Sequence, residues 1–77
     1  MQISLIKGRG HGFHVLIVKD ATAKEMKLGD FLENPAYKKV KFDNNNIELV
    51  KAAMENATHG FKIGLKQNMD EMINRNN

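Results

Sequence analysis

Residues 13–19, FHVLIVK, constrain the fold of this chain more than any other segment. They alternate in the manner of a β-strand, yet apolar side chains fall on both faces. One face carries Phe13, Val15 and Ile17, and the other carries Leu16 and Val18. A strand that is apolar on both faces normally lies in the middle of its sheet. The segment therefore predicts a central strand, in a chain of 77 residues that has few other elements to cover both sides.

A β-hairpin is predicted at the N-terminus. Residues 2–7, QISLIK, form a second β-branched run, and the glycine-rich stretch KGRGHG separates it from the strand at 13–19. Two such runs joined by about five residues that contain glycine are typical of a hairpin. We expect strands at 2–7 and 13–19.

The middle of the chain predicts a third strand and a short helix. In residues 37–42, YKKVKF, Val40 and Phe42 alternate with Lys39 and Lys41, which indicates a strand with a solvated basic face. Before it, one or two helical turns are expected near 28–33. They should end at Asn34-Pro35, because the residue before proline avoids the α region.

The C-terminal part contains the clearest helix pattern. Asp43 and the asparagines after it suit a turn or a helix N-cap, and an apolar stripe with helical spacing follows over residues 47–58. His59-Gly60 favours a helix end there. Residues 61–75 fit either a strand followed by a short helix or one continued helix; we favour a break at Gly60, since Gly60 and Gly64 each cost about 1 kcal/mol inside a helix. The stripe consists of Ile47, Val50, Met54 and Ala57, with Ala53 beside it.

These elements predict an α+β fold in one domain, residues 1–77. The expected architecture is a small antiparallel sheet, made of the N-terminal β-hairpin plus a third strand, packed against a C-terminal amphipathic helix.

The composition is that of a globular protein, with 42% apolar and 27% charged residues. The chain has no cysteine, so a disulfide framework is excluded and a reducing compartment such as the cytoplasm is favoured. No apolar run is long enough to span a membrane.

The glycine-rich stretch invites a phosphate-binding interpretation. Backbone N–H groups around Gly10 can form an anion-binding nest, and Lys7 and Arg9 would add positive charge. A P-loop, however, requires a lysine followed by serine or threonine at a helix start, and this stretch has neither. The alternative is a hairpin tip in which glycine relieves turn strain. His11 and His14 have H-x-x-H spacing without two further ligands nearby, so we expect neither a metal site nor a cofactor.

The supply of catalytic groups is small. The only serine and threonine hydroxyls are those of Ser4, Thr22 and Thr58, and each is explained by a strand or a helix end. A nucleophile, a base and an orienting group cannot be assembled from them. We therefore expect no enzymatic activity.

Two kinds of partner remain. Leu16 and Val18 lie on the second face of the strand, and so short a chain has few elements left to bury them. Exposed apolar patches of this sort commonly mark protein contacts. The leading hypothesis is a cytoplasmic inhibitor or regulator that occupies a protein partner, or a second copy of itself. The short, asparagine- and lysine-rich composition is typical of small phage proteins that act on a host factor.

The alternative is a nucleic-acid or nucleotide-binding module that uses the basic strands and the glycine-rich tip. The candidate contact residues are Lys7, Arg9, Gly10, His11, Leu16, Val18, Lys39 and Lys41.

Overall fold

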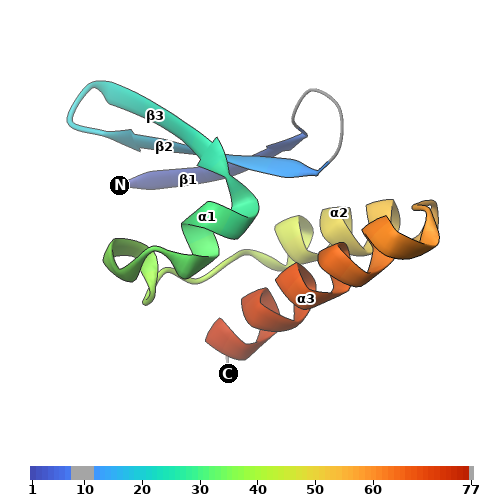
Figure 1. The fold of residues 1–77 in the computed structure, drawn as a ribbon. Coiled ribbons are helices and arrows are strands. Elements are labelled where there is room, and N and C mark those ends of the chain that lie inside the picture. Colours follow the sequence, from blue (N-terminus) through green and yellow to red (C-terminus); the bar gives the residue numbers. More distant parts are fainter. Residues whose placement is uncertain (8–11, 77) are drawn as a thin grey trace.

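The computed structural model describes residues 1–7 and 12–76 and shows a three-stranded sheet above a layer of helices (Figure 1). Within the described ranges the strands come first in the chain and the helices follow them. The elements are β1 (Gln2–Lys7), β2 (Phe13–Lys19), β3 (Thr22–Lys27), α1 (Leu28–Glu33), the 3-10 helix η1 (Pro35–Tyr37), α2 (Asn44–Glu55) and α3 (His59–Arg75).

The sheet has the order β1-β2-β3, and both pairs are antiparallel. Leu5 lies opposite Val15 in the first pair, and Val15 lies opposite Met26 in the second. The predicted α+β fold, the N-terminal hairpin and the central position of the strand at 13–19 are therefore confirmed.

A two-residue turn joins β2 to β3. Lys19 pairs with Thr22, and the two residues between them, Asp20 and Ala21, both have positive φ, at 51° and 66°. Positive φ at both central residues is the requirement of a type I′ turn, whose twist matches that of the flanking strands. The Thr22 hydroxyl donates a hydrogen bond of 2.6 Å to the Lys19 carbonyl and closes the turn. The third strand thus follows β2 immediately in the chain.

The prediction of a third strand at residues 37–42 is wrong. Pro35 begins η1, and the Asn34 side chain accepts a hydrogen bond of 2.9 Å from the backbone N–H of Ala36. The Tyr37 ring stacks on Phe31 with centroids 4.8 Å apart. Phe42 meets the same ring edge-on at 5.7 Å. The alternation of apolar and basic residues therefore reflects packing around Phe31, and no sheet pairing involves this segment.

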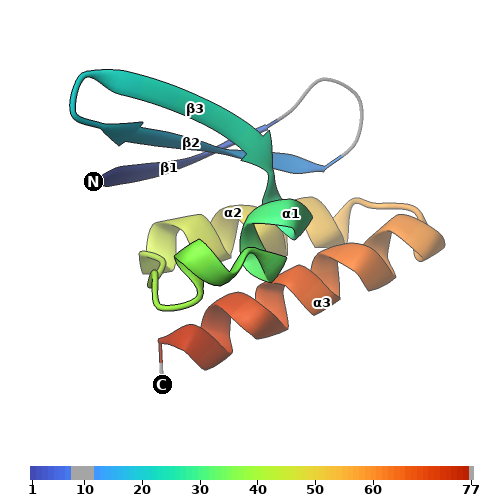
Figure 2. The ribbon, with the colours of Figure 1, turned by 60° about the vertical axis from the view of Figure 1, so that its left-hand side comes forward.

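The short helix α1 is where the sequence predicts it. It spans Leu28–Glu33, and Asn34 forms its C-cap. It turns the chain down from the end of β3 toward α3 (Figure 2). Leu28, Phe31 and Leu32 are its buried residues, which explains why three of six positions are large and apolar.

The two long helices begin and end elsewhere than predicted. α2 spans Asn44–Glu55, so it starts directly after its N-cap Asp43 and ends before the expected stop at His59-Gly60. α3 is one helix of 17 residues, His59–Arg75, so the strand favoured after Gly60 is wrong. Gly60 and Gly64 are exposed, and burial of Leu65 and Met72 on the core-facing stripe outweighs their cost. The predicted stripe of α2 does face the core, with Val50 fully buried.

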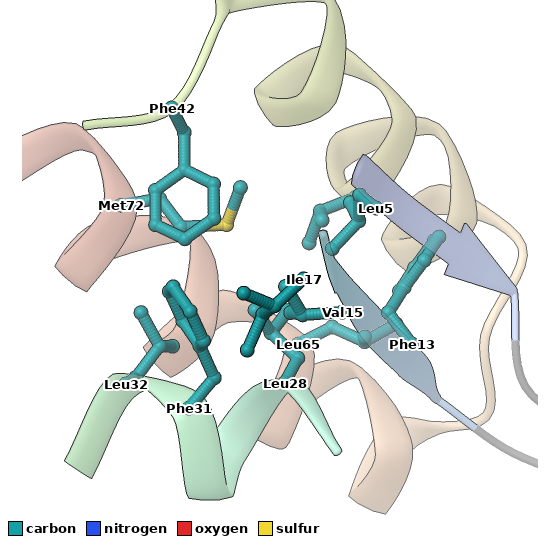
Figure 3. Packing of buried hydrophobic residues seen from close by; sticks show 11 residues of the cluster. Leu5, Phe13, Val15, Ile17, Leu28, Phe31, Leu32, Phe42, Leu65 and Met72 are labelled. Carbon is teal, nitrogen blue, oxygen red and sulfur yellow. The ribbon is translucent and has the colours of Figure 1, made fainter. Parts of the chain in front are cut away.

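One hydrophobic core lies between the sheet and the helices (Figure 3). The sheet contributes residues of one face only, since side chains alternate along a strand. The helices and the segment before α2 supply the rest. The core consists of Leu5, Phe13, Val15 and Ile17 from the sheet, and of Leu28, Phe31, Leu32, Phe42, Val50, Leu65 and Met72 from the helical layer.

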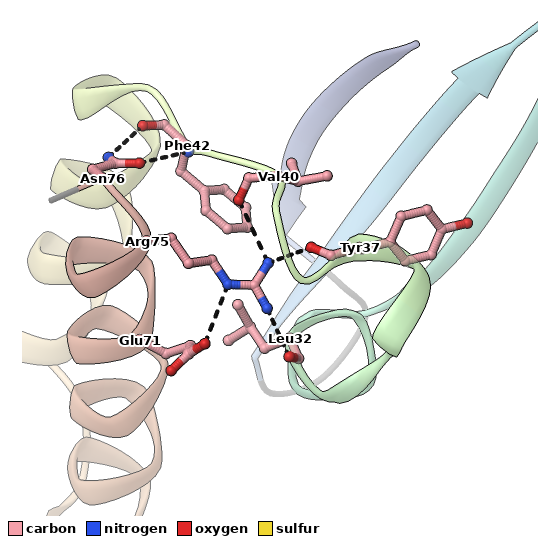
Figure 4. A network of polar contacts seen from close by, with 7 residues as sticks. All are labelled: Leu32, Tyr37, Val40, Phe42, Glu71, Arg75 and Asn76. Atoms are coloured by element: carbon pink, nitrogen blue, oxygen red, sulfur yellow. Dashed lines mark hydrogen bonds and ion pairs between the residues drawn. The ribbon is translucent and has the colours of Figure 1, made fainter.

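The end of α3 fastens this layer together (Figure 4). The Arg75 side chain is only 5% exposed, and its guanidinium donates to the carbonyls of Tyr37 at 2.6 Å and Leu32 at 2.7 Å. It also donates to Glu71 at 3.2 Å. The Asn76 side chain accepts from the backbone N–H of Phe42 at 3.1 Å and donates to its carbonyl at 2.7 Å. We call Arg75 and Asn76 the C-terminal clasp.

Candidate interaction surface

The second face of the sheet has no helix over it. Figures 1 and 2 show α1, α2 and α3 on one side of the strands, and the described residues place nothing on the other side. Since Leu5, Val15 and Ile17 point into the core, the alternating residues point away from it. We call this surface the open face. It consists of Gln2, Ser4 and Ile6 from β1, His14, Leu16 and Val18 from β2, and Ala23, Glu25 and Lys27 from β3.

Apolar side chains run obliquely across the open face. Val18 lies between Gln2 and Ala23, and Leu16 lies between Ser4 and Glu25. Ile6 lies opposite His14 in the next row. The three large apolar residues, Ile6, Leu16 and Val18, are all partly exposed, whereas Val15 on the core face is 0% exposed. The face therefore offers an apolar strip to a partner.

Polar groups border this strip on the β3 side. His14 Nδ1 and Glu25 Oε2 are 3.3 Å apart, with the two side chains 25% and 52% exposed. Lys27 lies opposite His14 and is exposed. An apolar centre with a polar, solvent-accessible margin is the usual composition of a protein–protein contact. Chemically, the face can bury apolar surface and position charged pairs at its edge.

The candidate contact residues that the structure describes do not form one site. Leu16 and Val18 lie next to each other on the open face, as the alternation predicts. Lys7 pairs with Phe13 and so points to the helix side of the sheet. Lys39 and Lys41 lie in the segment between η1 and α2, remote from any strand pairing. Arg9, Gly10 and His11 fall outside the described residues.

Two of the lysines expected on basic strands do not lie on a strand, since Lys39 and Lys41 belong to the segment between η1 and α2. Among the strand lysines, Lys7, Lys19 and Lys24 lie on the helix side of the sheet and Lys27 lies on the open face. Sequence reasoning also missed Glu25 and Lys27 as members of the surface, because β3 was not predicted. The Asp20-Ala21 pair before it was the only local indication.

Comparisons with protein-family models, with curated proteins and with solved structures give no match. Among residues 1–7 and 12–76, no three histidine or acidic side chains are grouped so as to hold a metal ion. None of the described helices has the length and apolar character that crossing a membrane demands.

Proposed function

We propose that this chain is a non-enzymatic binding protein that inhibits or regulates a protein partner by docking it on the open face. The observation that carries the proposal is the exposed strip of Ile6, Leu16 and Val18 on a sheet whose other side already holds the whole core. Removing such apolar area from water stabilises a complex by about 25 cal/mol per Å². The His14–Glu25 pair and Lys27 supply the polar margin that gives such a contact its orientation.

The size of the open face favours a reversible contact. Strands lie about 4.8 Å apart and rise about 3.3 Å per residue, so three strands of six residues cover about 14 by 20 Å. A standard interface removes about 800 Å² of accessible surface from each partner. The open face can form the centre of such an interface, and the partner must also reach its borders. Obligate dimers bury more than this, so the proposal favours a separate partner over a second copy.

The open face also contains a serine, a histidine and a glutamate, the groups of a hydrolytic triad. The His14–Glu25 contact is present, but among the contacts of the described residues none joins the Ser4 hydroxyl to His14. Leu16 is the residue opposite Ser4. A serine without a base in contact supports binding over catalysis.

A site-specific photo-crosslinker tests the proposal. Benzoylphenylalanine is placed at Leu16 on the open face or, as the matched control, at Leu49, which is 51% exposed on α2. In the cells that produce the chain, position 16 should give a discrete adduct with another protein and position 49 should not. Val18→Glu should abolish that adduct while the circular dichroism spectrum stays unchanged.

Other outcomes contradict the proposal. Adducts of equal intensity at positions 16 and 49 would mean that the open face has no preference for a partner. An adduct of twice the 8.7 kDa mass of the chain, and nothing else, would make a second copy the occupant. In that event the inhibitor role is lost and the chain is a homodimer.

A further inference from the structure

A cavity lies on the helix side of the sheet, away from the open face. It has a volume of about 560 Å³ and lies between the Lys7 end of the hairpin and the turn from α2 to α3. Figures 1 and 2 both show these two parts at the same end of the molecule. Pockets that bind small molecules typically measure about 300–1,000 Å³. The cavity is therefore large enough for a small organic ligand.

The walls of this cavity are mainly apolar. Phe13 and Phe61 provide aromatic surface, and the small side chains of Ala53 on α2 and Ala57 in the turn after it leave room beside the sheet. Gly12 has φ of +95°, and a side chain there would meet the Phe61 ring at 3.8 Å. Small residues thus keep open a space that larger side chains would fill. A ligand with an apolar body fits these walls.

The ionised charge on the described part of the cavity wall has one sign. Lys7 is the ionised residue among the lining residues that the structure describes, and Asn56 and Thr58 are the polar ones. The first turn of α3, which begins at this wall, contains no acidic residue. Glu55 in the last turn of α2 is exposed and is not part of the lining. A ligand group with a single negative charge is therefore favoured at the Lys7 end.

We propose that this cavity binds a small apolar carboxylate, with the carboxylate at Lys7 and the apolar body against Phe13, Phe61 and the two alanines. A single ammonium group matches the single negative charge of a carboxylate. The site shares no residue with the open face. This proposal and the protein-docking proposal can therefore fail independently.

Titration with three ligands of equal chain length tests this site. The ¹⁵N-labelled full chain is titrated with decanoate, decanol or decylamine, each below its micelle concentration, and amide shifts are followed by NMR. Decanoate should saturate one site, with shifts centred on Phe13, Ala57 and Phe61. It should bind about fivefold more tightly than decanol, the upper end of what one exposed ion pair contributes. Decylamine should bind more weakly than decanol.

Two variants and one control complete the test. Lys7→Gln should remove the preference for decanoate over decanol and leave decanol binding unchanged. Ala57→Leu should weaken both ligands by filling the cavity. Lys39→Gln, in the segment before α2, is the matched control and should change nothing. Equal affinity for decanoate and decylamine, shifts centred on Leu16 instead of Phe61, or an unaltered preference in Lys7→Gln would each overturn the proposal.

Discussion

Arg75 Nη2 donates a hydrogen bond of 2.7 Å to the carbonyl of Leu32, a residue 43 positions earlier in the chain. Through this contact the last turn of α3 satisfies one of the carbonyls that the end of α1 leaves without a helical partner. The guanidinium carbon also lies 6.0 Å from the ring centroids of both Phe31 and Phe42. One side chain therefore joins the end of α1, the segment before α2 and the end of α3.

Arg75→Met should destabilise the fold strongly. The variant keeps most of the apolar stem but removes the Arg75 donor from the Leu32 carbonyl and one of two donors from the Tyr37 carbonyl, which keeps the N–H of Val40; the expected cost is about 2–3 kcal/mol. Lys66→Met is the control, because the Lys66–Asp70 pair is exposed and should contribute only about 0.5 kcal/mol. Urea denaturation followed at 222 nm measures both. Equal stability of the two variants would mean that the clasp does not hold the fold.

Ala21→Gly should stabilise the protein. Ala21 adopts a left-handed φ of 66°, which is strained for a residue with a Cβ and natural for glycine. After the greater flexibility of glycine in the unfolded chain is subtracted, the expected gain is about 0.5–1 kcal/mol. Ala23→Gly, two residues later in β3, should lower stability by a similar amount, because glycine weakens a strand. Thermal unfolding of the two variants should therefore shift in opposite directions.

Two neighbouring residues of β2 should differ sharply in their tolerance of substitution. Val15 is 0% exposed in the core, so Val15→Ala should lower the free energy of unfolding by about 2 kcal/mol. Leu16→Ser on the open face should lower it by less than about 1 kcal/mol, although the change is chemically larger. Chemical denaturation of both variants tests the assignment of the two faces. A greater loss from Leu16→Ser would show that the open face is covered within the monomer.

Binding to nucleic acid should be weak and should vanish at physiological salt. Lys7 lies on the helix side of the sheet, Lys27 on the open face and Lys39 before α2, so few lysines can reach one phosphate backbone together. Fewer phosphate contacts mean both a lower affinity and a shallower dependence on salt. Fluorescence anisotropy with labelled single-stranded and duplex DNA measures this. Tight binding at about 0.15 M salt that Lys39→Gln weakens would contradict the expectation.

The hairpin was predictable from sequence because its information is local. The strands at 2–7 and 13–19 have the alternation and β-branched content of a sheet, and β2 is apolar on both faces. β3 has neither property, since five of the six residues of TAKEMK are exposed. It forms because a two-residue turn brings it against β2, and the turn uses Asp-Ala where Asn-Gly or Asp-Gly is the common pair. Pairing with an existing strand outweighed the weak local preference.

The helical layer was harder to predict for a different reason. In YKKVKF and FKIGLK, apolar and polar side chains alternate over six residues. So short an alternation is typical of a strand but also occurs by chance in a loop or a helix. The conformation of residues 37–42 is set by Phe31, because both Tyr37 and Phe42 pack on its ring. The second segment is helical because Leu65 and Met72, about two turns apart on the same face of α3, are both buried in the core. Neither contact can be inferred from the segment itself.

The candidate site was predicted in part. Leu16 and Val18 follow from strand alternation alone, because a central strand must present a second face. Their polar neighbours Glu25 and Lys27 could not be found without β3, and the lysines at 39 and 41 were placed on a strand that does not exist. The cavity at Lys7 depends on the distance between α2, α3 and the hairpin, which no local pattern contains.

The position of the C-terminal clasp has a consequence for how the protein is made. Synthesis runs from the N-terminus, so the sheet and α1 are made before Arg75 and Asn76, and the carbonyls of Leu32 and Phe42 lack these donors until residues 75 and 76 are added. A chain cut before Arg75 would keep β1, β2 and β3 but lose the contacts that join α3 to α1 and to the segment before α2. Such a truncated chain should be digested by proteases faster than the intact chain, because its helices would open more often.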